Sequence, residues 1–313
     1  MRYRDDRMQS AELRHLPGKI RRRISVLPTL CTLGNLLSGF AAIWYASGEH
    51  PELSGQISAY AIAGYLVFAA MLFDLLDGSV ARLTKATSDF GAELDSLADV
   101  VSFGIVPAFL TLRVISNLFA HRSTPSPDLL GPVTDSLLGR SLWIIAAIYV
   151  SCTALRLARF NAHNRHALEA HMVFRGLPSP GAAGVVASSV IFFEALQPNA
   201  PHVLPFHIPA AAAGDVNAAF PYAMPLIMLA VAILMVSRIA YGHLINQYLR
   251  GRRPFAYVVR AAILAILIFW QPQITALVAI YIYAFFAPLR ALWRKILRRP
   301  TSPLPMPPPP GSM

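Results

Sequence analysis

Charged side chains are scarce in this sequence. Asp, Glu, Lys and Arg together make up 14% of the 313 residues, whereas hydrophobic residues make up 55%. Soluble domains carry about 25% charged residues, and the mean hydropathy here is +0.50. This deficit excludes a soluble globular enzyme, a disordered chain and a nucleic-acid-binding domain. It predicts a polytopic membrane protein.

Cysteine is nearly absent as well. Cys31 and Cys152 are the two cysteines of the chain, and both fall inside apolar stretches. Neither their number nor their spacing is typical of a disulfide framework or a thiolate metal site. The first 26 residues are strongly basic and precede no small-residue cleavage site, which predicts no cleavable signal peptide.

Long apolar stretches recur along the chain. A helix that crosses a bilayer needs about 20 mostly apolar residues. We therefore expect an all-α transmembrane helix bundle of about eight spans, a six-span core followed by a C-terminal hairpin. A re-entrant final pair would leave six spans. The candidate spans are 27–47, 58–84, 90–117, 140–160, 178–197, 218–240, 256–271 and 273–293.

Lys and Arg are distributed unevenly over the connections between these spans. If the N-terminus lies inside, all of the 27 Lys and Arg residues fall on the inner side except Arg113, Arg122 and Arg140. Cytoplasmic loops of membrane proteins are enriched in Lys and Arg. The pattern predicts that both termini are cytoplasmic, in the inner membrane if the source is bacterial. The net charge of +11 then reflects membrane topology rather than nucleic-acid binding.

Composition divides the chain into four parts. We expect a basic cytoplasmic or interfacial segment over 1–26, a catalytic membrane core over 27–240, and a C-terminal hairpin with a basic end over 241–299. Residues 300–313 are rich in proline, which predicts a disordered tail.

Acidic residues are also few, and many of the 16 lie close together where the second span ends and the third begins. Their flanks, Met71 to Phe73 and Val100 to Phe103, are apolar, so these acids lie on helices rather than in a loop. Ionisable groups at membrane depth are costly and usually functional. The clustered acids are Asp74, Asp77, Asp89, Glu93, Asp95 and Asp99.

Helical spacing places most of this cluster on two stripes. Two antiparallel helices would bring the stripes face to face and gather carboxylates that Arg82 alone cannot neutralise. Such oxygen ligands favour Mg²⁺, Mn²⁺ or Ca²⁺ over zinc, and a pair of bridged ions suits phosphoryl transfer. Asp77 lies three residues after Asp74, on the same side of the predicted helix. The stripes are Asp74, Gly78, Ala81 and Arg82 on one helix, and Gly91, Asp95 and Asp99 on the next.

The residues from Asp74 to Asp99 resemble the signature of the CDP-alcohol phosphotransferases at every fixed position. They follow the pattern D-x2-D-G-x2-A-R-x8-G-x3-D-x3-D. The resemblance implies transfer of a phosphatidyl-type group from a CDP-linked lipid to an alcohol, with release of CMP. It implies two Mg²⁺ or Mn²⁺ ions as cofactors and Asp99 as general base. The implied metal ligands are Asp74, Asp77, Asp95 and Asp99, and the implied CDP-binding residues are Asp74, Gly78, Ala81, Arg82 and Gly91.

Two further segments are similar to the phosphatidylserine synthase branch of that family. One is the T-x-G-N stretch from Thr32, and the other is R-L-A-R-F-N from Arg156 followed by G-L-P-S-P from Gly176. The branch often has Pro-Asn where this chain has Pro28-Thr29. The resemblance implies CDP-diacylglycerol and L-serine as substrates, contact with membrane lipid, and a homodimer as in many members of the family. The implied acceptor-binding residues are Asn35, Arg156, Arg159 and Asn161.

Arginine suits serine because its guanidinium binds a carboxylate through two hydrogen bonds. Glycerol 3-phosphate and inositol phosphate are also anions, so these acceptors, and choline, stay open as alternatives. A cation or proton transporter that uses intramembrane carboxylates is an alternative of another class. A transporter would leave Gly78, Ala81 and Gly91 unexplained.

Overall fold

The computed structural model describes helices and no strand within the residues that it places, which confirms the all-α prediction. The predicted N-terminal segment, most of the predicted span 256–271 and the proline-rich tail lie outside these residues. The described residues are 18–48, 57–84, 89–120, 136–166, 176–197, 210–239, 241, 266–267 and 270–297. The helices are α2 (Gly18–Ser47), α3 (Ala59–Thr84), α4 (Asp89–Asp99), η2 (Val100–Ile105), α5 (Val106–Ala120), α6 (Leu137–His166), α7 (Ser179–Ala195), α8 (Ala210–Val236) and α11 (Pro272–Leu297).

Among the described residues, 6 helices are long and apolar enough to cross a membrane. The shorter helix α7 has 17 residues and is also apolar. The chain is therefore a multi-pass membrane protein. The six long spans are Leu27–Ser47, Ala59–Val80, Phe90–Phe119, Leu137–Ala162, Gly214–Val236 and Pro272–Ala291.

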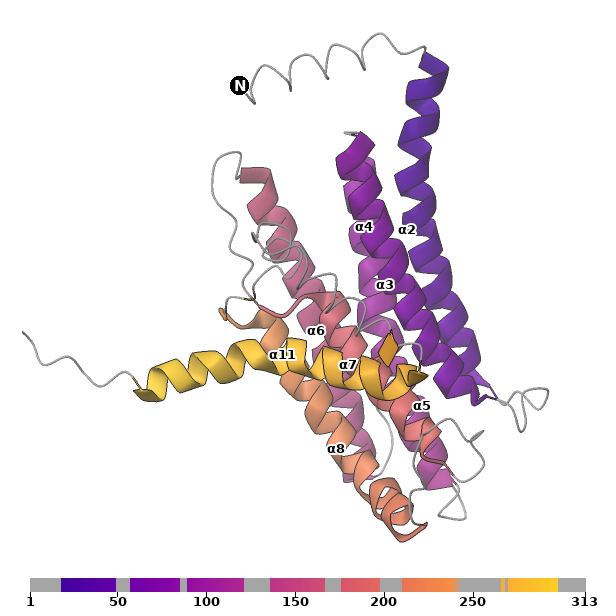
Figure 1. The fold of residues 1–313 in the computed structure, drawn as a ribbon, viewed down its shortest axis with the longest axis vertical. Coiled ribbons are helices and arrows are strands. Elements are labelled where there is room, and N and C mark those ends of the chain that lie inside the picture. Colours follow the sequence, from indigo (N-terminus) through magenta and orange to yellow (C-terminus); the bar gives the residue numbers. More distant parts are fainter. Residues whose placement is uncertain are drawn as a thin grey trace, which may run out of the picture.

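Helix α7 forms the centre of the bundle, and α3, α5, α8 and α11 pack against it (Figure 1). Most of its residues are buried, and many are Gly, Ala or Ser. Small residues allow helix backbones to approach closely in a membrane. A small residue also allows close approach from the side of α3, because a Cβ on its Gly64 would lie 2.6 Å from Ile191 of α7.

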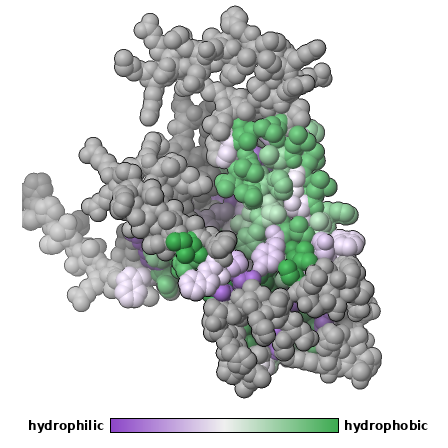
Figure 2. All heavy atoms as spheres, turned by 45° about the vertical axis from the view of Figure 1, so that its right-hand side comes forward, coloured by the Kyte–Doolittle hydropathy of each residue, from purple (hydrophilic) through white to green (hydrophobic). Residues whose placement is uncertain are grey.

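The outer surface of α2 is apolar and exposed. Leu33, Leu37, Phe40 and Trp44 follow one another at helical spacing and are 38–66% exposed. Figure 2 shows a broad apolar area on the side of the molecule where α2 and α3 lie. A continuous exposed apolar face of this kind fits contact with lipid rather than water.

A π-helical turn interrupts the third long helix directly after Asp99. The turn η2 joins α4 to α5, so that the helix runs from Asp89 to Ala120. Within it, the Phe103 carbonyl accepts a hydrogen bond from the Tyr149 hydroxyl at 3.0 Å. Such turns are frequent at functional sites. The apolar pattern of this segment did not predict the turn.

The connection that leads into α7 is anchored on the end of α8. The Gly176 amide donates to the Ile239 carbonyl at 2.8 Å, and the Leu177 amide donates to the Leu234 carbonyl at 3.0 Å. Gly176 has φ +91°, and a Cβ there would run into the Met235 carbonyl oxygen. Glycine adopts this conformation without steric cost. The anchor fixes where Ser179, the first residue of α7, lies.

Helix α11 lies across the bundle rather than along it (Figure 1). Its length and composition suffice for a span, and it packs mainly on α7. On α7, a Cβ at Gly184 would lie 3.0 Å from Ile280 of α11. The C-terminal segment is therefore in contact with the centre of the bundle.

Candidate active site

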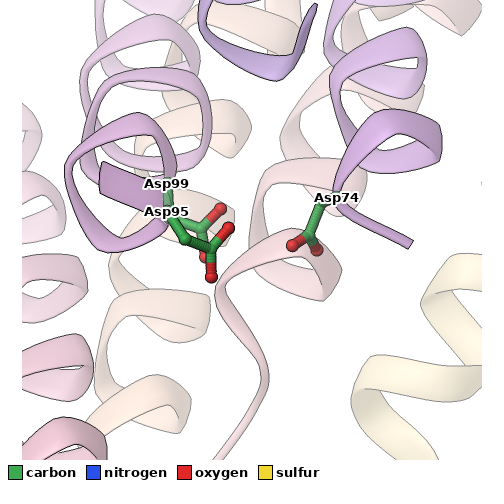
Figure 3. Close-up of side chains that lie close together, drawn as sticks. All are labelled: Asp74, Asp95 and Asp99. Carbon is green, nitrogen blue, oxygen red and sulfur yellow. The ribbon is translucent and has the colours of Figure 1, made fainter. Parts of the chain in front are cut away.

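Three carboxylates from two helices converge. Asp74 projects from α3, and Asp95 and Asp99 project from α4, so that one oxygen of each lies within 4.8 Å of the others. Figure 3 shows the three side chains pointing toward one another across the space between the helices. The two stripes thus face each other because α3 and α4 are antiparallel neighbours in the chain.

Asp77 lies next to this group of three. Its carboxyl group is hydrogen-bonded to that of Asp95, and the Thr32 hydroxyl of α2 donates to its Oδ2 at 3.0 Å. Asp77 is 7% exposed. All four acids of the sequence pattern therefore form one cluster, and α2 closes one side of it.

Asn35 contacts an acid of the cluster. Its Nδ2 donates to Asp99 Oδ1 at 3.2 Å, and its backbone carbonyl oxygen accepts from the Ser102 hydroxyl in η2 at 3.0 Å. Asn35 therefore contacts Asp99 through its side chain and η2 through its backbone. The sequence analysis gave Ser102 no role and named Thr32 only as the start of the T-x-G-N stretch, although Thr32 and Asn35 lie three residues apart, a spacing that puts them on one helix face.

The donor atoms of the cluster fit a metal ion. Asp95 Oδ1 and Asn35 Oδ1 are buried, and neither has a hydrogen-bond partner in the part of the chain that the structure describes. A buried polar atom without a partner is costly. Carboxylate and amide oxygens are the ligands that hard divalent cations prefer. The acidic cluster could therefore hold a metal ion, which would satisfy these oxygens.

Arg156 brings positive charge to the cluster from α6. Its guanidinium is in electrostatic interaction with Asp99 and Asp74, and its Nη1 donates to the Ser179 hydroxyl at 2.7 Å. Ser179 is fully buried at the start of α7. The anchored connection at Gly176 thus positions the hydroxyl group that orients Arg156.

The other two residues of the R-L-A-R-F-N segment lie differently. Arg159 is exposed, and Asn161 donates its Nδ2 to the Ser96 hydroxyl of α4 at 2.8 Å. This hydrogen bond ties α6 to the helix that carries Asp95 and Asp99. Of the predicted acceptor-binding residues, the structure therefore brings Asn35 and Arg156 to the acids, while Asn161 links helices.

Open space lies beside Gly78. A Cβ at this position would meet nothing within 4 Å among the residues that the structure describes, and within these residues the surface of α3 one turn beyond Asp74 is open to a ligand. Gly91 is partly exposed in the first turn of α4. The side chains of Ala81 and Arg82, in the last turn of α3, lie outside the described residues.

The fold and the site together define a multi-pass membrane protein with an acidic cluster that could hold a metal ion between its second and third long helices. The chain matches the model of the CDP-alcohol phosphatidyltransferase family over residues 25–289. It belongs to this family.

Several curated proteins named CDP-diacylglycerol–serine O-phosphatidyltransferase are similar to the chain. The one from Helicobacter pylori strain J99 is 34% identical over 166 residues, 53% of this chain and 57% of that protein. The one from Mycobacterium tuberculosis strain H37Rv is 33% identical over 178 residues, 55% of this chain and 52% of that protein. The one from Bacillus subtilis strain 168 is 31% identical over 159 residues, 51% of this chain and 72% of that protein. The chain thus spans little more than half the length of the first two relatives.

Proposed function

We propose that the protein transfers the phosphatidyl group of CDP-diacylglycerol to L-serine and releases CMP. The observation that carries this proposal is the convergence of Asp74, Asp95 and Asp99 within 4.8 Å. The Arg156 guanidinium is in electrostatic interaction with Asp99 and Asp74. Membership of the family and the printed names of the relatives support the reaction class and the acceptor.

Asp99 acts as the general base. It takes the proton of the serine hydroxyl while the serine oxygen forms a bond to the lipid-side phosphorus of the donor. The phosphorus–oxygen bond to CMP breaks in the same displacement, so phosphatidylserine and CMP are the products. The Asn35 amide, which donates to Asp99 at 3.2 Å, leaves the second carboxylate oxygen of Asp99 available for the proton.

Arg156 binds the carboxylate of serine. Its guanidinium fork matches a carboxylate, and the Ser179 hydroxyl, at 2.7 Å, orients it. This contact holds the serine hydroxyl near Asp99, since Arg156 interacts electrostatically with that acid. Positioning of this kind contributes to rate by replacing a random encounter with a bound geometry. Arg159 and Asn161 are assigned to the acceptor side by the sequence pattern.

Asp74, Asp77, Asp95 and Asp99 are the proposed ligands of two Mg²⁺ or Mn²⁺ ions. When bound, such ions neutralise the diphosphate of the donor and stabilise the charge that develops on its oxygens. Asp74, Gly78, Ala81, Arg82 and Gly91 form the proposed surface for CDP. The open space at Gly78 supports this assignment, because a nucleotide needs close access to the backbone there.

Both termini and the site face the cytoplasm in this proposal, and residues 27–240 form the catalytic core. The distribution of the 27 Lys and Arg residues supports this orientation. CDP-diacylglycerol enters from the membrane, and serine enters from the aqueous side.

The test is CMP release by purified protein supplied with CDP-diacylglycerol and Mn²⁺. We expect release with L-serine and little with glycerol 3-phosphate, inositol phosphate or choline. Removal of divalent ions with a chelator should abolish release, and added Mn²⁺ should restore it. Release with another acceptor alone would keep the family chemistry and overturn serine. No release from folded protein would overturn the proposal and favour a transporter.

A further inference from the structure

Helix α2 carries no acidic residue, yet it packs against both helices that carry the acids of the cluster (Figure 1). Thr32 and Asn35 lie three residues apart on one of its faces. The Thr32 hydroxyl donates to Asp77 Oδ2 of α3 at 3.0 Å, and the Asn35 amide donates to Asp99 Oδ1 of α4 at 3.2 Å. Helix α2 therefore holds one carboxyl group on each side of the cluster.

Close packing determines where this face of α2 lies. A Cβ at Gly34 would lie 2.8 Å from the Phe73 ring of α3. A Cβ at Gly39 would lie 2.5 Å from the Ser102 hydroxyl oxygen of η2. Small residues let helix backbones approach closely in a membrane, and a tightly packed interior leaves little room for displacement. A side chain on α2 can therefore serve as a fixed point for a carboxyl group on α3.

The Thr32 hydroxyl has one proton to donate and two acceptors within hydrogen-bond distance. The Pro28 carbonyl lies 3.1 Å away, and Asp77 Oδ2 lies 3.0 Å away. In an α-helix the carbonyl four residues earlier already accepts the backbone amide, whereas a charged carboxylate accepts the stronger hydrogen bond. The proton is therefore directed to Asp77, and the contact with Pro28 keeps threonine in the rotamer that faces this acid.

The contact with Asp77 distinguishes Thr32 from an ordinary threonine of a membrane helix. Thr111 of α5 follows Pro107 by four residues, and its hydroxyl donates to the Pro107 carbonyl at 2.9 Å. Such a bond to the preceding turn is a common arrangement for threonine in helices. Thr111 is 3% exposed and Thr32 is 4% exposed. Of these two threonines, Thr32 alone has a hydrogen bond to a carboxyl group within the described residues.

Water has little access to replace the hydroxyl at this position, because Thr32 and Asp77 are both buried. A buried carboxylate oxygen that loses its donor is left unsatisfied. On its other side, the carboxyl group of Asp77 is hydrogen-bonded to that of Asp95. Hydrogen bonds from neighbouring side chains orient carboxylates that bind metal ions, and loss of such a partner weakens metal binding about 10-fold to 100-fold.

We propose that Thr32 is a positioning residue that holds Asp77 in the orientation in which it binds a divalent metal ion. Its hydroxyl engages Oδ2 and restricts rotation of the carboxyl group. Helix α2, which lies outside the acidic sequence pattern, thereby becomes part of the metal site. This inference rests on the proposed function, because it takes Asp77 as a metal ligand. It predicts that the Thr32 hydroxyl sets the affinity of the cluster for the metal.

The experiment compares Thr32→Val with Thr111→Val in the purified full-length protein. Valine has nearly the shape of threonine, so each substitution removes one buried hydroxyl that follows a proline by four residues. Mn²⁺ binding is measured without substrates, from the EPR signal of the free ion. For Thr32→Val we expect the Kd for Mn²⁺ to rise about 10-fold to 100-fold. For Thr111→Val the Kd should stay within about twofold of wild type.

Two further measurements test whether the hydroxyl acts through the metal. Thr32→Ser keeps the hydroxyl, so its Kd for Mn²⁺ should stay within about threefold of wild type. At saturating Mn²⁺, CMP release by Thr32→Val with L-serine should return to within about threefold of wild type, because the ligands themselves are intact. Melting temperatures show whether each variant is folded. If Thr32→Val does not fold, Thr32→Ala, which also lacks the hydroxyl, takes its place with the same expected result.

An unchanged Kd for Mn²⁺ in Thr32→Val would overturn the inference. An equal rise in Thr111→Val would also overturn it, since loss of any buried hydroxyl would then suffice. The same conclusion follows if Thr32→Ser binds Mn²⁺ as weakly as Thr32→Val, because the shape of threonine rather than its hydroxyl would then matter. Loss of CMP release that saturating Mn²⁺ does not restore would assign Thr32 to the substrates and refute its role at the metal.

Failure of the proposed function is distinguishable from failure of this inference. Wild-type protein that binds Mn²⁺ but releases no CMP with any acceptor would refute the proposed function, and the binding comparison would still decide on Thr32. Wild-type protein that binds no Mn²⁺ but releases CMP with serine would overturn the inference and keep the reaction.

Discussion

Asp99 is closely held within the cluster. It is 7% exposed, the Asn35 amide donates to one of its oxygens at 3.2 Å, and it directly precedes the π-helical turn η2. A carboxylate held in this way has one oxygen committed to orientation and one available for chemistry. This division supports its proposed role as base, which it combines with its proposed place among the metal ligands.

Asp99→Asn should therefore separate turnover from binding. The amide keeps the volume of the carboxyl group but cannot accept a proton, so we expect kcat to fall by about 10²-fold to 10⁴-fold. Binding of CDP-diacylglycerol in the presence of Mn²⁺ should change by no more than a few fold. Single-turnover CMP release and equilibrium binding of the lipid measure the two quantities separately.

The matched control for this change is Asp215→Asn on α8. Asp215 is exposed and lies outside the acidic cluster, so the same acid-to-amide change should leave kcat within about twofold of wild type. Loss of lipid binding in Asp99→Asn would identify Asp99 as mainly a metal ligand and would refute its assignment as base.

Among the structural elements, the connection into α7 depends on a single backbone conformation. Gly176 combines φ +91° with close packing against the Met235 carbonyl. Gly176→Ala should destabilise the protein by about 2–4 kcal/mol, since it adds both a conformational penalty and a clash. It should also lower activity, because the same connection places Ser179 against Arg156. Thermal unfolding in detergent measures the first effect.

Gly214→Ala is the corresponding control for Gly176→Ala. Gly214 lies in α8, and a Cβ there would meet nothing within 4 Å in the described part of the chain. Alanine in a helix interior is favoured over glycine by about 0.5–1 kcal/mol, so this variant should be as stable as wild type or more so. Equal destabilisation by both substitutions would show that the conformation of Gly176 is not the cause.

The sequence predicted the spans and the acidic stripes because both rest on simple periodicity. Apolar runs of membrane length mark the helices, and the i, i+4 spacing puts Asp95 and Asp99 on one face. The contact between Asn35 and Asp99 could not be predicted in this way, since it joins residues 64 positions apart. Such pairings depend on helix packing, which spacing along one helix does not determine.

Two other features lay beyond sequence reasoning for related reasons. The π-helical turn η2 has the same apolar composition as an α-helix, so only the hydrogen bonds distinguish it. Helix α11 has the length and hydropathy of an ordinary span, yet it lies across the bundle (Figure 1) and packs on α7. Hydropathy reports that a segment prefers lipid or protein to water but not the direction in which it runs.

At the scale of the whole molecule, the distribution of positive charge predicts the orientation in the membrane. Arg113, Arg122 and Arg140 are the three basic residues that this topology leaves outside. Arg113 has a structural reason to lie there, because it donates to the Ala46 carbonyl at 3.0 Å and to the Ser47 carbonyl at 2.8 Å. Capping of the carbonyls at the end of α2 explains this exception to the charge rule.

Cysteine labelling tests the orientation directly. In a background with Cys31→Ser and Cys152→Ser, we expect Arg122→Cys to react with an impermeant maleimide in sealed right-side-out vesicles. Arg165→Cys, on the opposite side of the predicted topology, should react only after the vesicles are permeabilised. The background protein should stay unlabelled, and CMP release should persist in both variants, since neither residue belongs to the proposed site. The reverse labelling pattern would place the acidic cluster at the outer face, where cytoplasmic serine could not reach it.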